Sequence, residues 1–507
     1  MFENQPKGLF ALALANTGER FGYYTMLAVF ALFLRANFGL EAATAGQIYS
    51  TFLALVYFLP LVGGILADKI GYGKCVTIGI MVMFLGYILL AIPLGAGGTA
   101  MGAMIAALVL ISFGTGLFKG NLQVMVGNLY DDPKYADKRD AAFSLFYMAI
   151  NIGAMFAPTA AVKIMEWAQT SLGVSVNDSY HFAFMVACAS LVLSIAIYYA
   201  CRPWFKHVEN SAKQVATTSG AKVEELTPEQ TKKRIVALCL VFAVVIFFWM
   251  AFHQNGLTLT YFANEFVQPL CTGVQTMAFD IVNLVMIVVM VYAGFSLVQS
   301  KEKKTKLISG GAILAALGVL AYKYLNISAE GITLSAPIFQ QFNPFYVVAL
   351  TPFSMALFGA LAKKGKEPSA PRKIALGMVV ATVAYIVMAV ACVGLLTPNA
   401  QAVAGEGATF VNANVLIYTY LILTFAELLL SPMGISFVSK VAPPKYKGMM
   451  MGGWFVATAI GNYLVSIGGN LWGDMPLWGV WSVFVGVCAV AAIFMYSMMK
   501  KLEDATK

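Results

Sequence analysis

Asn16-Thr17-Gly18-Glu19-Arg20-Phe21-Gly22-Tyr23-Tyr24-Thr25-Met26-Leu27 places an acid beside a base inside the first long apolar segment of the chain. An ionised side chain at the middle of a bilayer costs roughly 2.5–3.5 kcal/mol on insertion scales, so such residues usually face a bundle interior and mark a substrate or ion path. At about 100° per residue, Asn16, Arg20, Tyr23 and Leu27 share one helical face, with Glu19 beside it. The stretch therefore predicts a polar stripe buried within a bundle of membrane helices.

The composition is that of a polytopic membrane protein. Of the 507 residues, 60% are hydrophobic and 11% are charged, whereas soluble proteins carry about 25% charged residues. A helix of about 20 residues crosses the roughly 30 Å hydrocarbon core, so the chain has room for many spans and leaves no soluble domain. We read no removable signal peptide, because no cleavage site of small residues follows a short apolar run. The seven cysteines lack CxxC spacing, so we expect neither a disulfide framework nor a metal or other cofactor.

Fourteen apolar segments divide the chain into two halves around a polar linker. The predicted fold class is an all-α membrane protein with two six-helix bundles plus an inserted two-helix hairpin, which the loop Lys301–Lys306 joins. The segments lie at 9–36, 46–68, 75–94, 99–128, 140–167, 181–201, 235–265, 275–299, 306–325, 338–362, 373–396, 412–439, 447–469 and 475–499. The predicted domains are the first bundle at 1–202, the cytoplasmic linker at 203–234, the first helix of the second bundle at 235–265, the inserted hairpin with its flanking loops at 266–336, and the remaining five helices with the tail at 337–507.

The basic residues support this number of spans and give an orientation. With the N-terminus in the cytoplasm, all but five of the 33 lysines and arginines fall at cytoplasmic ends and loops. The positive-inside rule predicts this asymmetry, and a missed span would invert every later loop. The net charge of +9 therefore follows membrane topology, and we expect no nucleic-acid partner. The five exceptions are Arg20, Arg35, Lys119, Lys163 and Lys323.

The turn between the second and third segments carries a recognisable pattern. It reads Gly63-Gly64-Ile65-Leu66-Ala67-Asp68-Lys69-Ile70-Gly71-Tyr72-Gly73-Lys74 and resembles the GxLaDrxGxrk loop of the major facilitator superfamily. The alternative is an ordinary glycine-rich turn with flanking charges. The resemblance implies two six-helix bundles around a central cavity, a common plan of transporters.

Five motifs resemble those of the proton-dependent oligopeptide transporter (POT) family, in the same order along the chain. The opening stretch resembles ExxERFxYY. Asn343-Pro344 and Trp454-Phe455 also fit the family. The other four motifs are Lys119-Gly120-Asn121, beside K-P-N; Phe146-Tyr147-Met148-Ala149-Ile150-Asn151-Ile152-Gly153, like FYxxIN-G; Phe248-Trp249-Met250-Ala251-Phe252-His253-Gln254; and Glu427-Leu428-Leu429-Leu430-Ser431-Pro432-Met433-Gly434, like E-L-x-x-S-P-x-G.

Four charged residues are predicted within the spans: Glu19, Arg20, Lys119 and Glu427. An ion pair between Lys119 in the first half and Glu427 in the second would close one face of the cavity, and protonation of Glu427 would weaken it. Glu19 and Arg20 would form a second switch tied to the fourth helix. For Lys119, the alternative is a long side chain that reaches the membrane interface.

The same residues suit a zwitterionic peptide, which needs cationic groups at one end and acidic or amide groups at the other. Arg20 and Lys119 would supply the first. Glu427, Asn151 and Asn343 would supply the second. Ordinary helix packing is an equal alternative for any single tyrosine among the aromatic residues expected to line the space between, which are Tyr23, Tyr24, Tyr57, Tyr147 and Trp454.

Three positions depart from the family pattern. Asn16 replaces the first glutamate of ExxER, Leu27 replaces an arginine, and His253 replaces an acid before glutamine. In the family the last two positions are thought to form an outer gating pair, and losing both charges together can be nearly neutral, whereas losing one strands a buried charge. We consider His253 as a substitute proton site because its unperturbed pKa is about 6.5; the alternative is a neutral histidine hydrogen-bonded within the bundle.

The resemblance implies a monomeric transporter that imports di- or tripeptides or peptide-like solutes by alternating access, with protons as the coupled ion. Glu19, Glu427 and His253 are the expected proton-responsive groups. Asn16 and Leu27 motivate an alternative, a proton-independent uniporter or exchanger of another small solute. A receptor would need a signalling domain, and an enzyme a motif such as HExxH or GxSxG; neither is visible in the sequence. The expected location is the cytoplasmic (cell inner) membrane, with both termini in the cytoplasm.

Overall fold

The computed structural model describes residues 5–135, 139–209, 226–443 and 446–505, and these ranges contain fourteen helices long and apolar enough to cross a membrane. The predicted number of spans and the all-α fold class are confirmed. Residues 210–225 of the predicted linker at 203–234 lie outside the described residues. Its last part differs from the prediction: α7 begins at Pro228, because Thr227 and Gln230 form a capping box that starts the helix early.

Six helices form the first bundle, in which α1 packs against α5 and α6, and α4 packs against α2 and α3. Four of the connections between them are short, as expected between antiparallel neighbours. Their bounds are α1 Lys7–Phe38, α2 Ala42–Ile70, α3 Tyr72–Ala91, α4 Gly98–Asn128, α5 Arg139–Ser171 and α6 Val176–Ala200. The short turns η2 Arg202–Trp204 and η3 Lys206–Val208 follow.

The second bundle also has six spans, three of them interrupted by short irregular segments. The span at Pro228–Phe266 breaks at η5 His253–Gly256, where Leu257 leaves the helical region with φ −115° and ψ −88°. The elements are α7 Pro228–Phe252 with α8 Thr258–Phe266, η7 Ala336–Gln341 with α11 Phe342–Lys363, α12 Ala370–Ala391, α14 Asn414–Val441, α15 Lys447–Tyr463 with α16 Ser466–Leu471, and α17 Leu477–Ser497. The short helices α13 Pro398–Val403 and α18 Met499–Asp504 lie at its ends.

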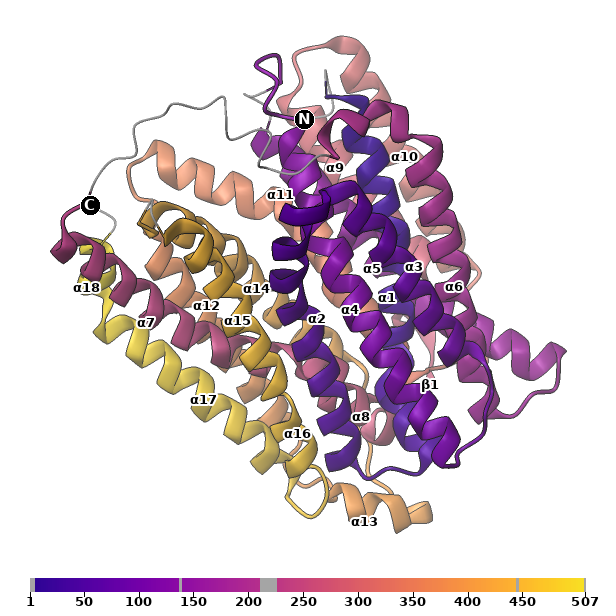
Figure 1. Cartoon of the computed structure of the whole chain (residues 1–507). Helices are drawn as coiled ribbons and strands as arrows, with labels where there is room; N and C mark the ends of the chain where they lie inside the picture. Colours follow the sequence, from indigo (N-terminus) through magenta and orange to yellow (C-terminus); the bar gives the residue numbers. More distant parts are fainter. Residues whose placement is uncertain (1–4, 136–138, 210–225, 444–445, 506–507) are drawn as a thin grey trace.

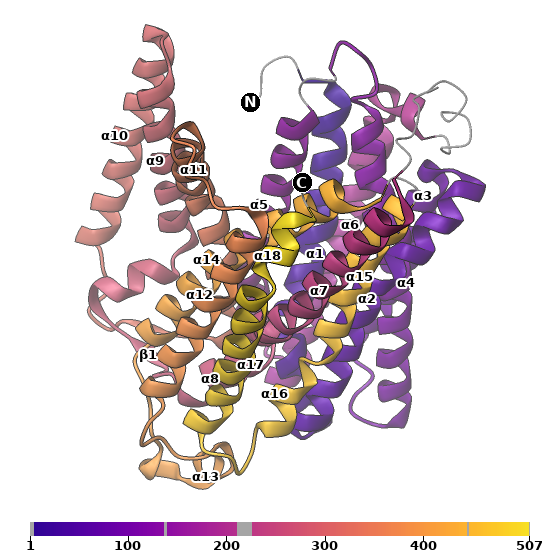
Figure 2. The ribbon, with the colours of Figure 1, turned by 90° about the vertical axis from the view of Figure 1, so that its left-hand side faces the viewer.

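The inserted hairpin consists of α9 Ile281–Gln299 and α10 Lys303–Leu325, which stand at the edge of the molecule (Figure 2). In the apolar window of each helix only 11% of the residues are buried, against 72% for α1, so most of the hairpin surface is available to lipid. It joins the second bundle through α11, where the rings of Phe295 and Phe353 lie 5.0 Å apart. The strand β1 Leu270–Cys271 precedes the hairpin and pairs with β2 Ile332–Thr333, which follows it. This pairing joins the two segments that flank the hairpin.

The two bundles meet on one side of the membrane region and diverge on the other. We call the side on which α1 begins and α17 ends the terminal side, and the opposite side the distal side. Helices α7 and α17 lean away from α1, α3 and α6 toward the terminal side (Figure 1). On the distal side, Thr159 of α5 donates to Gln341 of η7 at 2.8 Å, and Gly46 of α2 approaches Gly469 of α16. The distal side is therefore closed.

Glycines of the turn motif set how closely α2 and α4 approach. A Cβ atom on Gly63 would lie 2.1 Å from the carbonyl oxygen of Gly116, whereas one on Gly64 would meet nothing within 4 Å. Asn121 of the Lys119-Gly120-Asn121 motif donates to the Gly63 carbonyl at 3.1 Å and locks the same contact. Gly63 and Asn121, which both belong to motifs that resemble those of known families, therefore hold α2 and α4 together.

This contact gives the first prediction. Gly63→Ala is expected to destabilise the protein by about 1–3 kcal/mol, because overpacking against backbone forces the helices apart. Gly64→Ala is the matched control, and it should be neutral or slightly stabilising because alanine favours the helix by up to about 1 kcal/mol over glycine. Thermal unfolding of both purified variants in the same detergent is the measurement. Equal melting temperatures would contradict the assignment.

Candidate functional site

The polar stripe of α1 faces the interior of the first bundle. Arg20 donates to both carboxylate oxygens of Glu19, from Nε and Nη2, and the two side chains are 3% and 0% exposed. The guanidinium carbon also lies 4.5 Å from the centroid of the Tyr23 ring. The two charges balance each other within α1, and among the described residues neither side chain makes a hydrogen bond to the fourth helix.

Lys119 of α4 points toward the second bundle across an aromatic ring. Its Nζ lies 4.2 Å from the centroid of the Tyr57 ring of α2, within the range of a cation–π contact. It also interacts electrostatically with Glu19 and Arg20. Among the residues that the structure describes, Lys119 makes no ion pair with Glu427. The predicted ion pair between Lys119 and Glu427 is therefore not formed in this conformation. The ammonium group of Lys119 contacts the Tyr57 ring instead.

Glu427 of α14 is the acidic group of the second bundle. Asn343 of α11 donates to its Oε2 at 2.8 Å and to Thr424 Oγ1 at 3.1 Å. Glu427 is 8% exposed and has no ion pair with any basic residue in the described ranges. Three tyrosines of the first bundle interact electrostatically with Glu427: Tyr24, Tyr57 and Tyr147. The side chain of Tyr147 also hydrogen-bonds to the Glu427 carboxylate. The structure thus brings Glu427 and Asn343 together and sets them opposite tyrosines of the other bundle.

His253 lies at the break between α7 and α8, beside the same space. Its Nδ1 is 2.5 Å from Asn462 Oδ1 of α15, and its ring stacks on Trp249 at 5.0 Å and 19°. The centroid of the Tyr57 ring is 6.0 Å away. Tyr57 therefore separates Lys119 from His253, and these two groups interact electrostatically across it. The partner Asn462 could not be assigned from the sequence, because it lies 209 positions away.

Three predicted lining residues are held by their own bundle. Tyr23 is 2% exposed and packs on Phe52 and Tyr24. Trp454 is 4% exposed, and its ring lies so close to Gly434 that a Cβ there would be 2.0 Å from it. Asn151 donates to the Tyr147 carbonyl of its own helix at 3.0 Å. Tyr23 and Asn151 therefore make these contacts within the first bundle, and Trp454 makes its contact within the second.

The distal closure rests on an ion pair that the sequence analysis did not single out. Arg35, at the distal end of α1, pairs with Glu265, at the distal end of α8, and so joins the two bundles. The Arg35 guanidinium lies 4.6 Å from the centroid of the Tyr261 ring, and Trp472 Nε1 donates to Glu265 Oε2 at 3.0 Å. The sequence held a sign of this pair, because Arg35 is one of the five basic residues outside the predicted cytoplasmic ends. Its acidic partner is far away in sequence.

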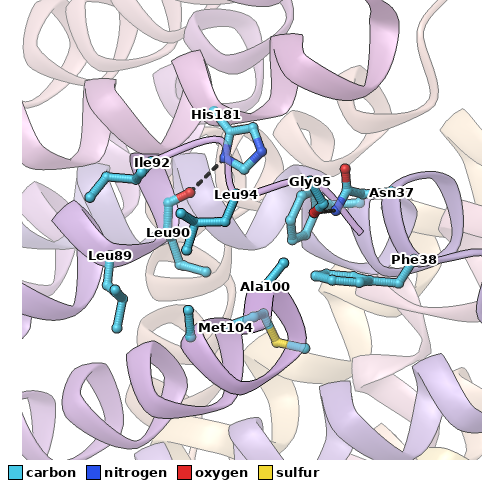
Figure 3. A pocket seen from close by; sticks show the side chains of 12 residues that line it. Asn37, Phe38, Leu89, Leu90, Ile92, Leu94, Gly95, Ala100, Met104 and His181 are labelled. Atoms are coloured by element: carbon cyan, nitrogen blue, oxygen red, sulfur yellow. Dashed lines mark hydrogen bonds between the residues drawn. The ribbon is translucent and has the colours of Figure 1, made fainter. Parts of the chain in front are cut away.

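A small cavity at the distal end of the first bundle lies apart from these groups (Figure 3). It has a volume of about 10 Å³, about the space of one water molecule, and His181, Asn37 and Met104 are among its lining residues. His181 Nδ1 is 2.7 Å from the Leu90 carbonyl at the end of α3, and Asn37 donates to the Gly95 carbonyl at 3.0 Å. These contacts hold helix ends and the connecting turn, so we leave them outside the candidate site.

Comparison with known proteins agrees with the fold and the motifs. The model of the POT family matches residues 74–227 and 317–474, more than half of the chain. The chain is 29% identical to the uncharacterized transporter YclF of Bacillus subtilis, covering 100% of this chain and 95% of that protein. It is 27% identical to the dipeptide and tripeptide permease A of Klebsiella pneumoniae, covering 90% of this chain and 82% of that protein.

Solved structures show the same fold. The crystal structure of peptide transporter POT in complex with sulfate matches with a TM-score of 0.75 at 23% identity, over 100% of this chain and 96% of that one. A POT family transporter in complex with 5-aminolevulinic acid matches with a TM-score of 0.73 at 20% identity, over 100% of this chain and 98% of that one. Five motifs, fourteen spans and a family model that covers both halves lead to one conclusion: the chain belongs to the POT family.

Proposed function

We propose that this protein imports di- or tripeptides, or peptide-like solutes, across the cytoplasmic membrane by alternating access and with coupled protons. The observation that carries the proposal is the pairing of Glu427 and Asn343 in one bundle opposite Lys119 and three tyrosines of the other. The relatives named as dipeptide and tripeptide permeases favour peptides. The relatives solved with 5-aminolevulinic acid and with alafosfalin favour tolerance of peptide-like solutes.

The chemistry of a peptide's ends matches the two sides of this site. Glu427 would hold the ammonium group, because it is buried, its carboxylate hydrogen-bonds only to the neutral side chains of Asn343 and Tyr147 among the described residues, and it has no described basic partner. Lys119 would hold the carboxylate, because its ammonium group rests on the Tyr57 ring and makes no ion pair with a described residue. A bound peptide would then connect the bundles in place of a direct Lys119–Glu427 pair. Tyr24 and Tyr147 would contact the peptide between its ends.

The orientation completes the proposal. Basic residues gather at the terminal side, which we assign to the cytoplasm under the positive-inside rule. The structure is closed distally, so it corresponds to the conformation that releases substrate into the cell. For the opposite conformation, the distal contacts at Arg35 and Gln341 must break. Lys119 and Glu427 are then the charges available to pair and close the terminal side. We propose the protein as a monomer, as expected from the family resemblance.

Uptake into liposomes tests the proposal. The purified protein would be given labelled dialanine, with and without an imposed inward proton gradient. Accumulation driven by the gradient is the expected result. Equilibration without accumulation would favour the alternative of a proton-independent uniporter or exchanger, which Asn16 and Leu27 motivate because they remove charges that the family carries. Absence of uptake in both conditions would contradict transport of simple peptides.

His253 gives the second prediction. His253→Gln is expected to remove part of the pH dependence of uptake, because glutamine keeps a hydrogen-bonding group beside Asn462 but cannot take up a proton. The matched control is His207→Gln, the same change at an exposed histidine of η3. The initial rate of uptake would be measured across a pH series for both variants. A profile for His253→Gln equal to that of the unmodified protein would rule out a coupling role.

A further inference from the structure

A pocket of about 310 Å³ opens on the distal side between the two bundles, on the opposite face from the proposed substrate release. One wall is the last part of α5, with Met165, Glu166 and Gln169. The other wall is formed by the end of α8 and by the segments that flank the inserted hairpin, with Asn264, Gln268 and Ser335. The exposed positions of Glu166, Asn264 and Gln268 make the pocket accessible from the distal solution.

The pocket exists because the distal side is closed. Its two walls are joined next to it by the Thr159–Gln341 hydrogen bond, one turn before the lining part of α5 and just after the lining segment that ends at Ala336. Any conformation that separates the bundles distally also separates these walls. A ligand that contacts both walls must therefore bind the closed conformation more tightly than the open one, and it shifts the equilibrium by that difference in affinity.

The lining residues indicate the chemistry of such a ligand. Glu166 is the one ionisable side chain among the lining residues, so the pocket favours a cation. Glu166 pairs with Lys163 of its own helix at 2.8 Å, but that lysine side chain is 69% exposed, and exposed pairs of this kind contribute only about 0–1 kcal/mol. A ligand cation can replace it at small cost. Val162, Met165 and Val267 offer apolar contacts to the rest of the molecule.

We infer that this pocket binds a small organic cation with an apolar body and that its occupancy holds the distal gate closed. The volume lies at the lower end of the 300–1,000 Å³ range of small-molecule pockets, so the ligand would have on the order of ten to fifteen non-hydrogen atoms. Bound from outside, it would act as an inhibitor that leaves the central site free. This inference rests on the proposed alternating access for its effect on transport, but not for binding.

The experiment uses benzyltrimethylammonium, whose fixed charge keeps it on the side to which it is added. Added outside cells that express the protein, it should lower the maximal rate of dialanine uptake, and saturating dialanine should not fully reverse this inhibition because the central site stays free. Benzyl alcohol, which has a similar apolar body and no charge, should have no effect at the same concentration. Inhibition that saturating dialanine fully reverses would mean binding at the central site and would overturn the inference, as would absence of inhibition.

Three substitutions locate the effect. Glu166→Gln should weaken inhibition about fivefold or more, the equivalent of about 1 kcal/mol. Lys163→Gln should strengthen inhibition, because it frees the Glu166 carboxylate. Glu330→Gln, at an exposed acid on the distal side outside the pocket, is the matched control and should change nothing. Inhibition that is equal in all three variants would overturn the assignment of the pocket.

Binding to the purified protein separates this inference from the transport proposal. Radiolabelled benzyltrimethylammonium should bind the unmodified protein and bind Glu166→Gln more weakly, with no peptide present. If uptake of dialanine fails but this binding is found, the proposed function is wrong and the pocket stands. If uptake succeeds and binding is absent, the pocket assignment is wrong and the proposed function stands.

Discussion

Glu427→Gln is expected to reduce gradient-driven uptake of dialanine by about a hundredfold. Glutamine has nearly the same shape and can still accept the hydrogen bond from Asn343 Nδ2. It removes the charge that would hold the peptide ammonium group, and a charge-assisted hydrogen bond in a buried site contributes about 1.5–3 kcal/mol. It also removes a group that can take up a proton. Initial uptake rates in liposomes, with protein amount matched between variants, are the measurement.

The way in which activity is lost distinguishes the two roles of Glu427. If the carboxyl group mainly carries a proton, Glu427→Gln should lose accumulation but keep exchange of labelled for unlabelled peptide. If it mainly binds the ammonium group, exchange should be lost as well. Thr424→Val is the matched control, because it removes the other acceptor of Asn343 and leaves the carboxylate in place. Uptake of Glu427→Gln at the level of the control would remove this residue from the site.

The membrane architecture could be predicted from the sequence because the bilayer imposes it. The lengths of the apolar segments predicted the spans, and the basic loops supported their number. The described residues contain fourteen helices that are long and apolar enough to cross a membrane. The early start of α7 was missed because Thr227 and Gln230 lie in a polar stretch that reads as linker, although they form a helix cap. The two capping hydrogen bonds start the helix there, although the segment as a whole is polar.

The site residues could be predicted as a set, but their contacts could not. Lys119 and Glu427 are opposite charges in opposite halves, so the sequence suggested a pair, yet a transporter makes such a pair in one conformation and breaks it in another. Trp454 reads as a lining aromatic residue, but the absence of a side chain on Gly434 lets its ring pack inside the bundle. Which way a side chain points depends on packing between helices, and the sequence pattern alone does not give it.

Reversing the charge of Arg35 is expected to hold the distal gate open. In Arg35→Glu, a second carboxylate would face Glu265 in place of the present ion pair, in which the two side chains are 32% and 19% exposed. Loss of the attraction costs about 1 kcal/mol for a pair this exposed. Repulsion between like charges near the surface adds to it, for a total on the order of 2–4 kcal/mol. The ratio of closed to open conformations should therefore fall at least about thirtyfold, and uptake should fall with it.

The charge-swapped variant Arg35→Glu with Glu265→Arg should recover the closed conformation in part, because attraction returns while the contacts with Tyr261 and Trp472 are altered. Spin labels at Glu41 and Glu406, on distal turns of the two halves, would report the distance between them. Lys323→Glu is the matched control, since Lys323 pairs with Asp280 on the same side but within the hairpin and its flank. An unchanged distance in Arg35→Glu would show that the Arg35–Glu265 ion pair does not stabilise the closed conformation. Recovery by the double variant would show that attraction between α1 and α8 holds the distal side closed.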